Sequence, residues 1–203
     1  MSTLQPAERR RLQNRSEAQR AILEAAEAML VADGYDQLSM RKLAARCGYT
    51  APTIYHYFGD KPGLIDAVLD RALADLLGEL RQAPLGEDPL ADMRSLFCAF
   101  ARWGLHNPIH YELLTIRRDP EAEPLPSGEE AQALFETPFA DLAAQGRLVM
   151  EDVETTKQAF WLVLHGFISL QRSRPDVEWS EALMEQALDA MIRGSIRDPE
   201  KKP

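Results

Sequence analysis

The stretch of sequence that decides the fold is residues 39–58, which read SMRKLAARCGYTAPTIYHYF. Its first half predicts a short amphipathic helix, because its apolar residues recur at the helical spacing i, i+3, i+4 and i+7. These residues are Met40, Leu43, Ala44 and Cys47. Ser39 can cap the start of this helix through its hydroxyl, and Gly48 can take the left-handed conformation that ends a helix in a tight turn.

A second short helix is predicted directly after this turn. Thr50 is a natural N-cap for a helix that runs through Tyr57, and Pro52 suits its first turn, where no backbone donor is needed. Two short helices joined by a tight turn form the helix-turn-helix arrangement. The geometry alone leaves DNA binding open, because many helix pairs in ordinary bundles also have a glycine at the corner.

Outward from this segment, apolar residues recur at helical rather than alternating spacing almost throughout the chain. We therefore predict an all-α fold of about nine helices. The helix before the segment is expected from about 16 to 32, and a long connecting helix is expected to begin at 60 with Pro62 in its first turn. Five further helices are expected at 90–105, 108–117, 129–145, 153–171 and 179–197.

Charge divides the chain into two different parts. The formal net charge is −9, but residues 1–62 hold 9 Lys+Arg against 7 Asp+Glu, net +2, which leaves 14 against 25, net −11, for residues 63–203. The arginines of the first twenty residues form a small basic arm that can touch phosphate or a minor groove, or that is a solvated disordered tail. They are Arg9, Arg10, Arg11, Arg15 and Arg20.

Composition excludes several classes of protein. No stretch approaches the roughly 20 apolar residues of a membrane span, and the N-terminus lacks the apolar core of a signal peptide, so we expect a cytoplasmic protein without a membrane partner. Cys47 and Cys98 lack the spacing of a disulfide framework or a zinc site and are expected to be buried free thiols. His106 and His110 are four residues apart, but Pro108 between them predicts a helix start. We expect no metal and no cofactor.

Residues 38–64, which read LSMRKLAARCGYTAPTIYHYFGDKPGL, closely resemble the DNA-binding signature of the tetracycline-repressor (TetR) family. The resemblance covers about residues 17–77. It implies that Ser39 and Arg41 contact phosphate or a base edge, and that a second group faces the major groove. The groove-facing residues are Tyr49, Thr50, Ala51, Pro52 and Thr53. It implies further that Tyr55, His56 and Lys61 hold phosphates, with Lys61 just inside a helix N-terminus that also favours an anion.

Two positions depart from the family pattern. Tyr49 replaces the usual aliphatic residue after the turn glycine, and Cys47 replaces the usual alanine before it. We expect Tyr49 either to read bases or to pack on a methyl group, and Cys47 to belong to the core.

Residues 159–170, which read AFWLVLHGFISL, are apolar on nearly every face, and such a helix must be covered on both sides. One side can meet its own subunit and the other a symmetry mate, together with one face of the last helix. That face holds Leu183, Ala187, Ala190 and Met191. We therefore predict a homodimer with a four-helix interface, which also suits the reading of a pseudo-palindrome by two recognition helices. The alternative is a monomer in which this helix is fully buried.

The pattern Trp161-x-x-x-His165-Gly166 resembles one TetR C-terminal subfamily. A set of aromatic residues in the C-terminal half can line a pocket for an apolar or aromatic small molecule, although aromatic residues at helical spacing are also typical of a core. The set is Phe100, Trp103, Tyr111, Phe135, Phe139, Trp161, His165 and Phe167.

Together these features predict a flexible basic arm at 1–16, a helix-turn-helix domain at 17–77, a larger helical ligand-sensing and dimerisation domain at 84–197, and a tail at 198–203. The function expected is that of a repressor that binds operator DNA and is released by an effector. One alternative is a helical enzyme that uses His106, His110 or His165 with Glu112 or Asp141, but the chain has no nucleophile elbow, phosphate-cradling glycine loop or metal-ligand spacing. An acidic adaptor that binds only proteins is the other alternative.

Overall fold

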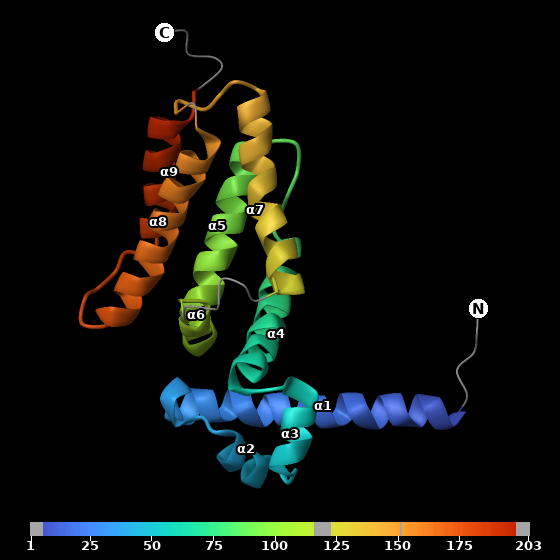
Figure 1. Cartoon of the computed structure of the whole chain (residues 1–203). Helices are drawn as coiled ribbons and strands as arrows, with labels where there is room; N and C mark the ends of the chain where they lie inside the picture. The colour runs from blue at the N-terminus through green and yellow to red at the C-terminus, as the bar shows by residue number, and fades with distance from the viewer. Residues whose placement is uncertain (1–5, 116–122, 151, 198–203) are drawn as a thin grey trace. The chain divides into compact units, whose positions relative to one another are not determined.

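The structure is a computed structural model that describes residues 6–115, 123–150 and 152–197. In these ranges the chain forms nine α-helices and one short 3₁₀ helix, and its only strand-like feature is an isolated bridge between Leu148 and Ile196 (Figure 1). The all-α prediction is confirmed. The elements are α1 (Pro6–Asp33), η1 (Tyr35–Gln37), α2 (Met40–Cys47), α3 (Ala51–Phe58), α4 (Lys61–Arg81), α5 (Pro89–His106), α6 (Pro108–Thr115), α7 (Pro126–Ala144), α8 (Val153–Ser173) and α9 (Leu183–Ser195).

The chain divides into two compact units at the boundary between Arg71 and Ala72. The first unit holds α1, η1, α2, α3 and the first half of α4, and the second holds the rest of α4 together with α5 to α9. α4 is thus one continuous helix whose residues belong to both units. None of the helices in the described ranges is long and apolar enough to cross a membrane.

The first helix differs from the prediction at its start. α1 begins at Pro6, ten residues before the expected start near 16, so residues 6–16, which were expected to precede the helix as an arm, are helical. The cause is local: this segment contains no glycine, consists mostly of good helix formers, and has a proline at the first helical position. Residues 1–5 of the predicted arm lie outside the described residues.

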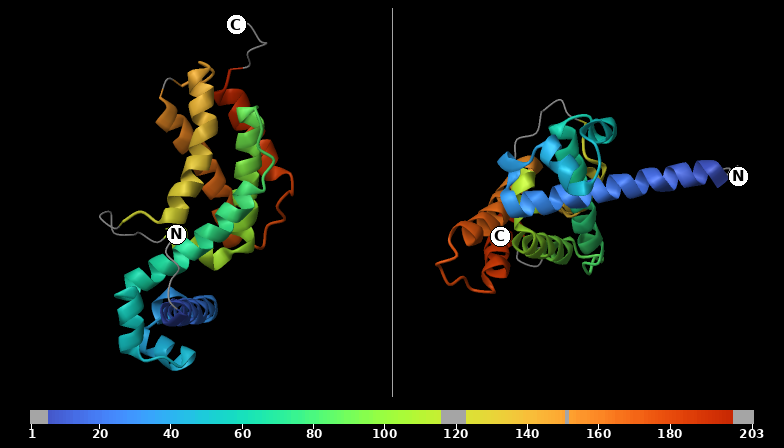
Figure 2. Two further views of the ribbon diagram at one scale, coloured as in Figure 1. Left: turned by 90° about the vertical axis from the view of Figure 1, so that its right-hand side faces the viewer. Right: turned by 90° about the horizontal axis from the view of Figure 1, so that it is seen from below.

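The core of the first unit is built from single faces of its helices. One face of α1 is buried, with Ile22 and Ala26 fully enclosed. α2 packs against α1 and α3 packs against α2, and Ile54, also fully enclosed, anchors α3. The N-terminal half of α1 extends beyond α2 and α3 (Figures 1 and 2).

In the second unit α5 is the central helix and contacts α6, α7, α8 and α9. Its core includes large side chains that are almost completely enclosed, among them Phe97, Trp103 and Phe160. α9 begins at Leu183 rather than at 179, and in the turn before it the Trp179 indole donates a hydrogen bond to the Arg174 carbonyl, 3.1 Å away. The predicted helix ends at 116–117 and the tail at 198–203 lie outside the described residues.

Candidate nucleic-acid interface

The caps predicted around α2 are present. Ser39 has extended backbone angles (φ −133°, ψ 145°), and its hydroxyl accepts a hydrogen bond from the Lys42 amide at 3.2 Å. Gly48 adopts the left-handed conformation (φ 75°, ψ 15°) and its amide donates to the Ala44 carbonyl at 3.1 Å. A side chain at position 48 would be strained in this conformation, so the glycine fixes the corner between α2 and α3.

Thr50 caps α3 as predicted. Its hydroxyl accepts a hydrogen bond from the Thr53 amide at 3.3 Å and lies 2.8 Å from the Thr53 hydroxyl. Pro52 lies in the first turn, where its missing N–H leaves no hydrogen bond unmade. The first turn of α3 therefore exposes a hydroxyl pair and a proline, which are small groups that allow a helix to approach base edges in a major groove.

The turn between α3 and α4 requires two close contacts. The Asp60 carboxylate accepts a hydrogen bond from the Gly63 amide at 2.8 Å and so caps α4. A Cβ atom added to Gly63 would lie 2.3 Å from the Phe58 carbonyl oxygen, so this position admits only glycine without a backbone shift. The turn thereby fixes the position of Lys61, the first residue of α4, relative to the end of α3.

None of the ten residues predicted to contact DNA is buried. Five are exposed, and the side chain of Tyr55 among them is 49% accessible. The exposed residues are Arg41, Thr50, Pro52, Tyr55 and His56. The other five are half-buried: Ser39, Tyr49, Ala51, Thr53 and Lys61. The fold brings all ten onto α2, the glycine turn, α3 and the start of α4, within one compact unit.

Lys61 has structural contacts that the sequence did not reveal. Its ammonium donates a hydrogen bond to the Tyr35 carbonyl at 2.9 Å and lies 4.2 Å from the centroid of the Tyr35 ring. These contacts attach the start of α4 to η1. An ammonium group carries three donors, so this arrangement leaves capacity for a phosphate oxygen.

Arg15 was also missed as a neighbour of α3. Its guanidinium carbon lies 5.9 Å from the centroid of the Tyr57 ring, and that ring lies 5.5 Å from His56. The first helix was predicted to begin at 16, so the prediction did not say in which direction the side chain of Arg15 points. The helical register of a longer α1 was the signal that could have found it.

Seven of the eight residues predicted to line a ligand pocket form one aromatic cluster in the second unit. The closest ring centroids are those of Trp161 and His165, 4.6 Å apart. Phe97 and Phe160, which were not predicted, extend the cluster. The eighth residue, Phe167, is half-buried and has no described ring contact with the cluster. The other seven are Phe100, Trp103, Tyr111, Phe135, Phe139, Trp161 and His165.

A small polar network lies at the edge of this cluster. The Tyr111 hydroxyl lies 2.8 Å from His165 Nδ1, 3.2 Å from the Ser169 hydroxyl and 3.3 Å from the His165 carbonyl oxygen. His165 Nε2 is buried and has no hydrogen-bond partner among the described residues. Burial lowers the pKa of His165 and so favours its neutral form. The cluster thus contains one unsatisfied polar atom, and such an atom is costly unless it gains a partner.

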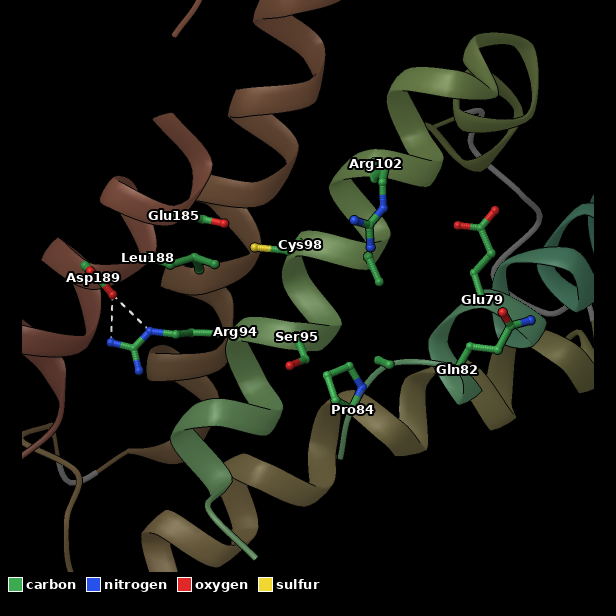
Figure 3. A pocket seen from close by; sticks show the side chains of 12 residues that line it. Glu79, Gln82, Pro84, Arg94, Ser95, Cys98, Arg102, Glu185, Leu188 and Asp189 are labelled. Atoms are coloured by element: carbon green, nitrogen blue, oxygen red, sulfur yellow. Dashed lines mark hydrogen bonds and ion pairs between the residues drawn. The ribbon is translucent and has the colours of Figure 1, made fainter. Parts of the chain in front are cut away.

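A cavity of about 790 Å³ lies elsewhere in the second unit, among the C-terminal end of α4, α5 and α9 (Figure 3). None of the eight predicted pocket residues lines it. Its walls are partly polar. The Arg94 guanidinium binds Asp189 Oδ1 at 2.6 and 2.9 Å, and burial together with the Glu185 carboxylate raises the pKa of the Cys98 thiol. Within the described ranges, no three His, Cys, Asp or Glu residues are grouped so that they could hold a metal ion.

Comparison with known proteins gives two family matches. The N-terminal model of bacterial regulatory proteins of the tetR family matches residues 22–68, and the model of a tetracyclin repressor-like C-terminal domain matches residues 93–194, half of the chain. A relative from Mycobacterium tuberculosis, an uncharacterised helix-turn-helix-type transcriptional regulator, is 27% identical over 158 residues, which cover 74% of this chain and 68% of the relative.

Solved structures show the same fold. A TetR-family transcription regulator from Shewanella sp. PV-4 superposes with a TM-score of 0.69 at 18% identity, covering 89% of this chain and 99% of the other. NalD, the secondary repressor of the MexAB-OprM multidrug efflux pump of Pseudomonas aeruginosa, superposes with a TM-score of 0.61 at 23% identity, covering 91% and 98%.

Proposed function

Because the chain belongs to the TetR family of DNA-binding transcriptional regulators, we propose that it is a repressor that binds a pseudo-palindromic operator as a homodimer and is released by a small effector. The family is not one of enzymes, so the alternative enzyme built on His106, His110 or His165 is set aside. The observation that carries the proposal is α3 itself: buried Ile54 anchors it in its unit, and Thr50, Pro52 and Tyr55 are exposed.

The DNA-binding surface follows from these positions. Thr50, Ala51, Pro52 and Thr53 form the first turn of α3, where small side chains suit contact with base edges. Tyr55, His56 and Lys61 follow at its far end and have hydroxyl, imidazole and ammonium groups that suit phosphate oxygens. The first group is proposed to set the sequence preference, and the second to set the position of α3 on the duplex.

The homodimer is proposed from the outer face of α8. Leu162 is 74% exposed and Leu170 is 51% exposed. They lie eight residues apart, on one side of the helix, so this face holds large apolar side chains in contact with solvent. On α9, Ala190 is exposed and Ala187 is half-buried. Apolar residues gathered on two adjacent helices are typical of a subunit interface. A two-fold pairing of α8 and α9 would bury both faces in a four-helix interface.

The effector is proposed to bind at the aromatic cluster. The rings of Phe100 and Trp161, whose centroids lie 5.4 Å apart, belong to an aromatic and apolar region that suits an aromatic or apolar molecule, and His165 Nε2 offers one hydrogen bond to a polar group on it. The name of NalD, a repressor of an efflux pump with a similar fold, supports the role of a repressor for this chain. Release is proposed to act through α4, because this single helix runs from Lys61 into the second unit.

The proposal is tested by selecting binding sites for the purified full-length protein from random-sequence duplex DNA. We expect an inverted repeat to emerge. Tyr55→Phe, which removes only a hydroxyl, should weaken binding of the selected site, and the double variant Tyr55→Ala with Lys61→Ala should abolish it. Because Lys61 also contacts Tyr35, circular dichroism must show that the double variant is folded. Failure to enrich any sequence, or full binding by the folded double variant, would contradict the proposal.

A further inference from the structure

The N-terminal half of α1 has no place in the core of its unit. Every residue from 7 to 17 is exposed, and Ala18 is the first buried one. Figure 2 shows this part of α1 extending away from α2 and α3. Its own side-chain contacts are a Gln13–Glu17 hydrogen bond of 3.1 Å and one from the Ser16 hydroxyl to the Gln13 carbonyl. Its described tertiary contact is that of Arg15 with the Tyr57 ring. A helical segment with little tertiary packing is marginally stable in water, so this one is a candidate for contact with a partner.

The charge of the segment indicates the chemistry of that partner. Residues 6–17 contain four arginines and two glutamates. Arg9, Arg10 and Arg11 form no ion pair with any described residue. Unpaired guanidinium groups are typical of surfaces that bind phosphate, because their donors match phosphate oxygens in pairs.

The four arginines divide between two faces of α1. Arg11 and Arg15 precede Ala18 and Ile22 at the spacings of four, three and four residues that keep side chains on one face of a helix. They therefore continue the stripe with which α1 packs into its unit. Arg9 and Arg10 lie about a third of a turn or more away from this stripe, given 3.6 residues per turn.

A contact of Arg15 shows in which direction the face with Arg11 and Arg15 points. Arg15 lies over the Tyr57 ring of α3, and Tyr57 lies beside His56. Arg15 thus contacts α3 through Tyr57, the chain neighbour of His56, which is proposed to hold phosphate, and so lies at the edge of the proposed DNA-binding surface. Arg11 follows about 6 Å farther along the axis of α1, at 1.5 Å per residue, so the two guanidinium groups extend this edge outward.

We propose that Arg11 and Arg15 of each protomer bind backbone phosphates of the DNA that flanks the segment contacted by α3. This inference rests on the proposed function. Backbone contacts add affinity and salt dependence and do not read the sequence. The helical arm therefore lengthens the DNA footprint of the protein without changing the sequence that it prefers.

The test compares two full-length double variants that lose the same charge from different faces: Arg11→Gln with Arg15→Gln, and Arg9→Gln with Arg10→Gln. Affinity for the selected duplex is measured against salt concentration. A dimer that loses four phosphate contacts should lose about 3 to 4 from the slope of log K against log salt, at about 0.9 per phosphate. The Arg9/Arg10 variant should lose less than about 1, the value of a single contact. On a duplex cut back to the repeat itself, the wild type should bind no more tightly than the Arg11/Arg15 variant.

Three results would overturn the inference. An equal decrease of the salt-dependence slope in the two variants would mean that the arm acts only as diffuse positive charge. An unchanged slope in the Arg11/Arg15 variant would mean that these side chains do not contact DNA. Failure of the wild type to bind any duplex would overturn the proposed function as well, and it is distinguished from the other results because it needs no variant. Residues 7–17 are exposed, so both variants should keep the wild-type circular dichroism spectrum.

Discussion

At the scale of single residues, this molecule depends on small groups in fixed places. Gly63 illustrates this, because the Phe58 carbonyl occupies the space that a Cβ atom would need. His165 illustrates it differently, since one ring nitrogen is satisfied by Tyr111 and the other has no described partner. The first position determines how α4 leaves α3, and the second gives an otherwise apolar cluster one polar atom.

Gly63→Ala should destabilise the first unit by about 1–3 kcal/mol, because the added methyl group forces the backbone of the α3–α4 turn to shift. Gly78→Ala in α4 is the matched control: its Cβ would meet nothing within 4 Å, and it should be neutral or stabilising by about 0.5–1 kcal/mol. Hydrogen exchange of α3 and α4 followed by mass spectrometry measures both changes. Equal protection of the two variants would contradict the close contact.

The neutral state of His165 predicts a dependence of stability on pH. Its folded pKa is lowered by burial, while the unfolded pKa is about 6.5. Below about pH 6.5 the unfolded chain therefore takes up a proton that the folded chain does not. The free energy of unfolding is therefore unaffected by His165 above this pH. It decreases as the pH falls towards the folded pKa, by at most about 1.4 kcal/mol per pH unit.

His165→Asn removes this titration, so its stability should change less than that of the wild type between pH 7.5 and pH 5.5. Urea unfolding followed by tryptophan fluorescence measures the difference, because Trp103, Trp161 and Trp179 all belong to the second unit. Parallel pH profiles of the two proteins would be the contradictory result.

At the scale of the elements, α2 and α3 were predicted nearly residue by residue, because their ends are set by local signals. Ser39, Gly48 and Thr50 act on backbone groups within four residues of themselves, and such interactions can be read from sequence. The start of α1 was missed because residues 6–16 have helix propensity but no apolar periodicity. The start of α9 was missed because its N-cap, Ala182, has no capping side chain that the sequence could signal.

The candidate sites were predictable to different degrees for the same reason. The sequence motif predicted the proposed DNA contacts, which lie on neighbouring elements of one unit, but the Lys61–Tyr35 contact joins residues 26 positions apart. The Tyr111–His165 and Tyr111–Ser169 contacts join residues 54 and 58 positions apart. Contacts of this range depend on how helices pack, and a single sequence does not encode that packing in any local pattern.

Substitutions of Thr50 can separate its role as the cap of α3 from its proposed contact with DNA. Thr50→Ala should cost about 1 kcal/mol of stability through loss of the α3 cap. Thr50→Asp should keep the cap, because aspartate is an equally good N-cap, while its charge repels phosphate. We therefore expect Thr50→Asp to melt like the wild type and to lose DNA binding. Thermal melting and a binding titration on the selected duplex test this, and tight binding by Thr50→Asp would contradict the placement of Thr50 at the DNA.

At the scale of the whole molecule, the acidic chain is reconciled with a DNA partner by the uneven distribution of its charge. Residues 1–62 have a net charge of +2 and the remainder a net charge of −11. The basic groups lie on α1, α2 and α4, in the same compact unit as the proposed recognition helix. The acidic remainder includes the aromatic cluster and the exposed face of α8.

The proposed dimer gives a prediction at this scale. Leu162→Glu with Leu170→Glu should convert the dimer to a monomer, because it places charges in an interface that is otherwise apolar. Val149→Glu is the control, since Val149 is also exposed, at 46%, but lies outside α8 and α9. Analytical ultracentrifugation measures the masses. A dimeric double variant, or a monomeric wild type, would place the interface elsewhere or remove it.

The central claim is that two copies of α3, held by one dimer, read two half-sites on the same face of the duplex. The most direct test measures the affinity of the wild type for the selected inverted repeat and for the same repeat with about five base pairs inserted at its centre, half a helical turn. We predict that the insertion weakens binding towards the nonspecific level, by about 10³-fold or more. Equal affinity for the two duplexes would contradict the claim.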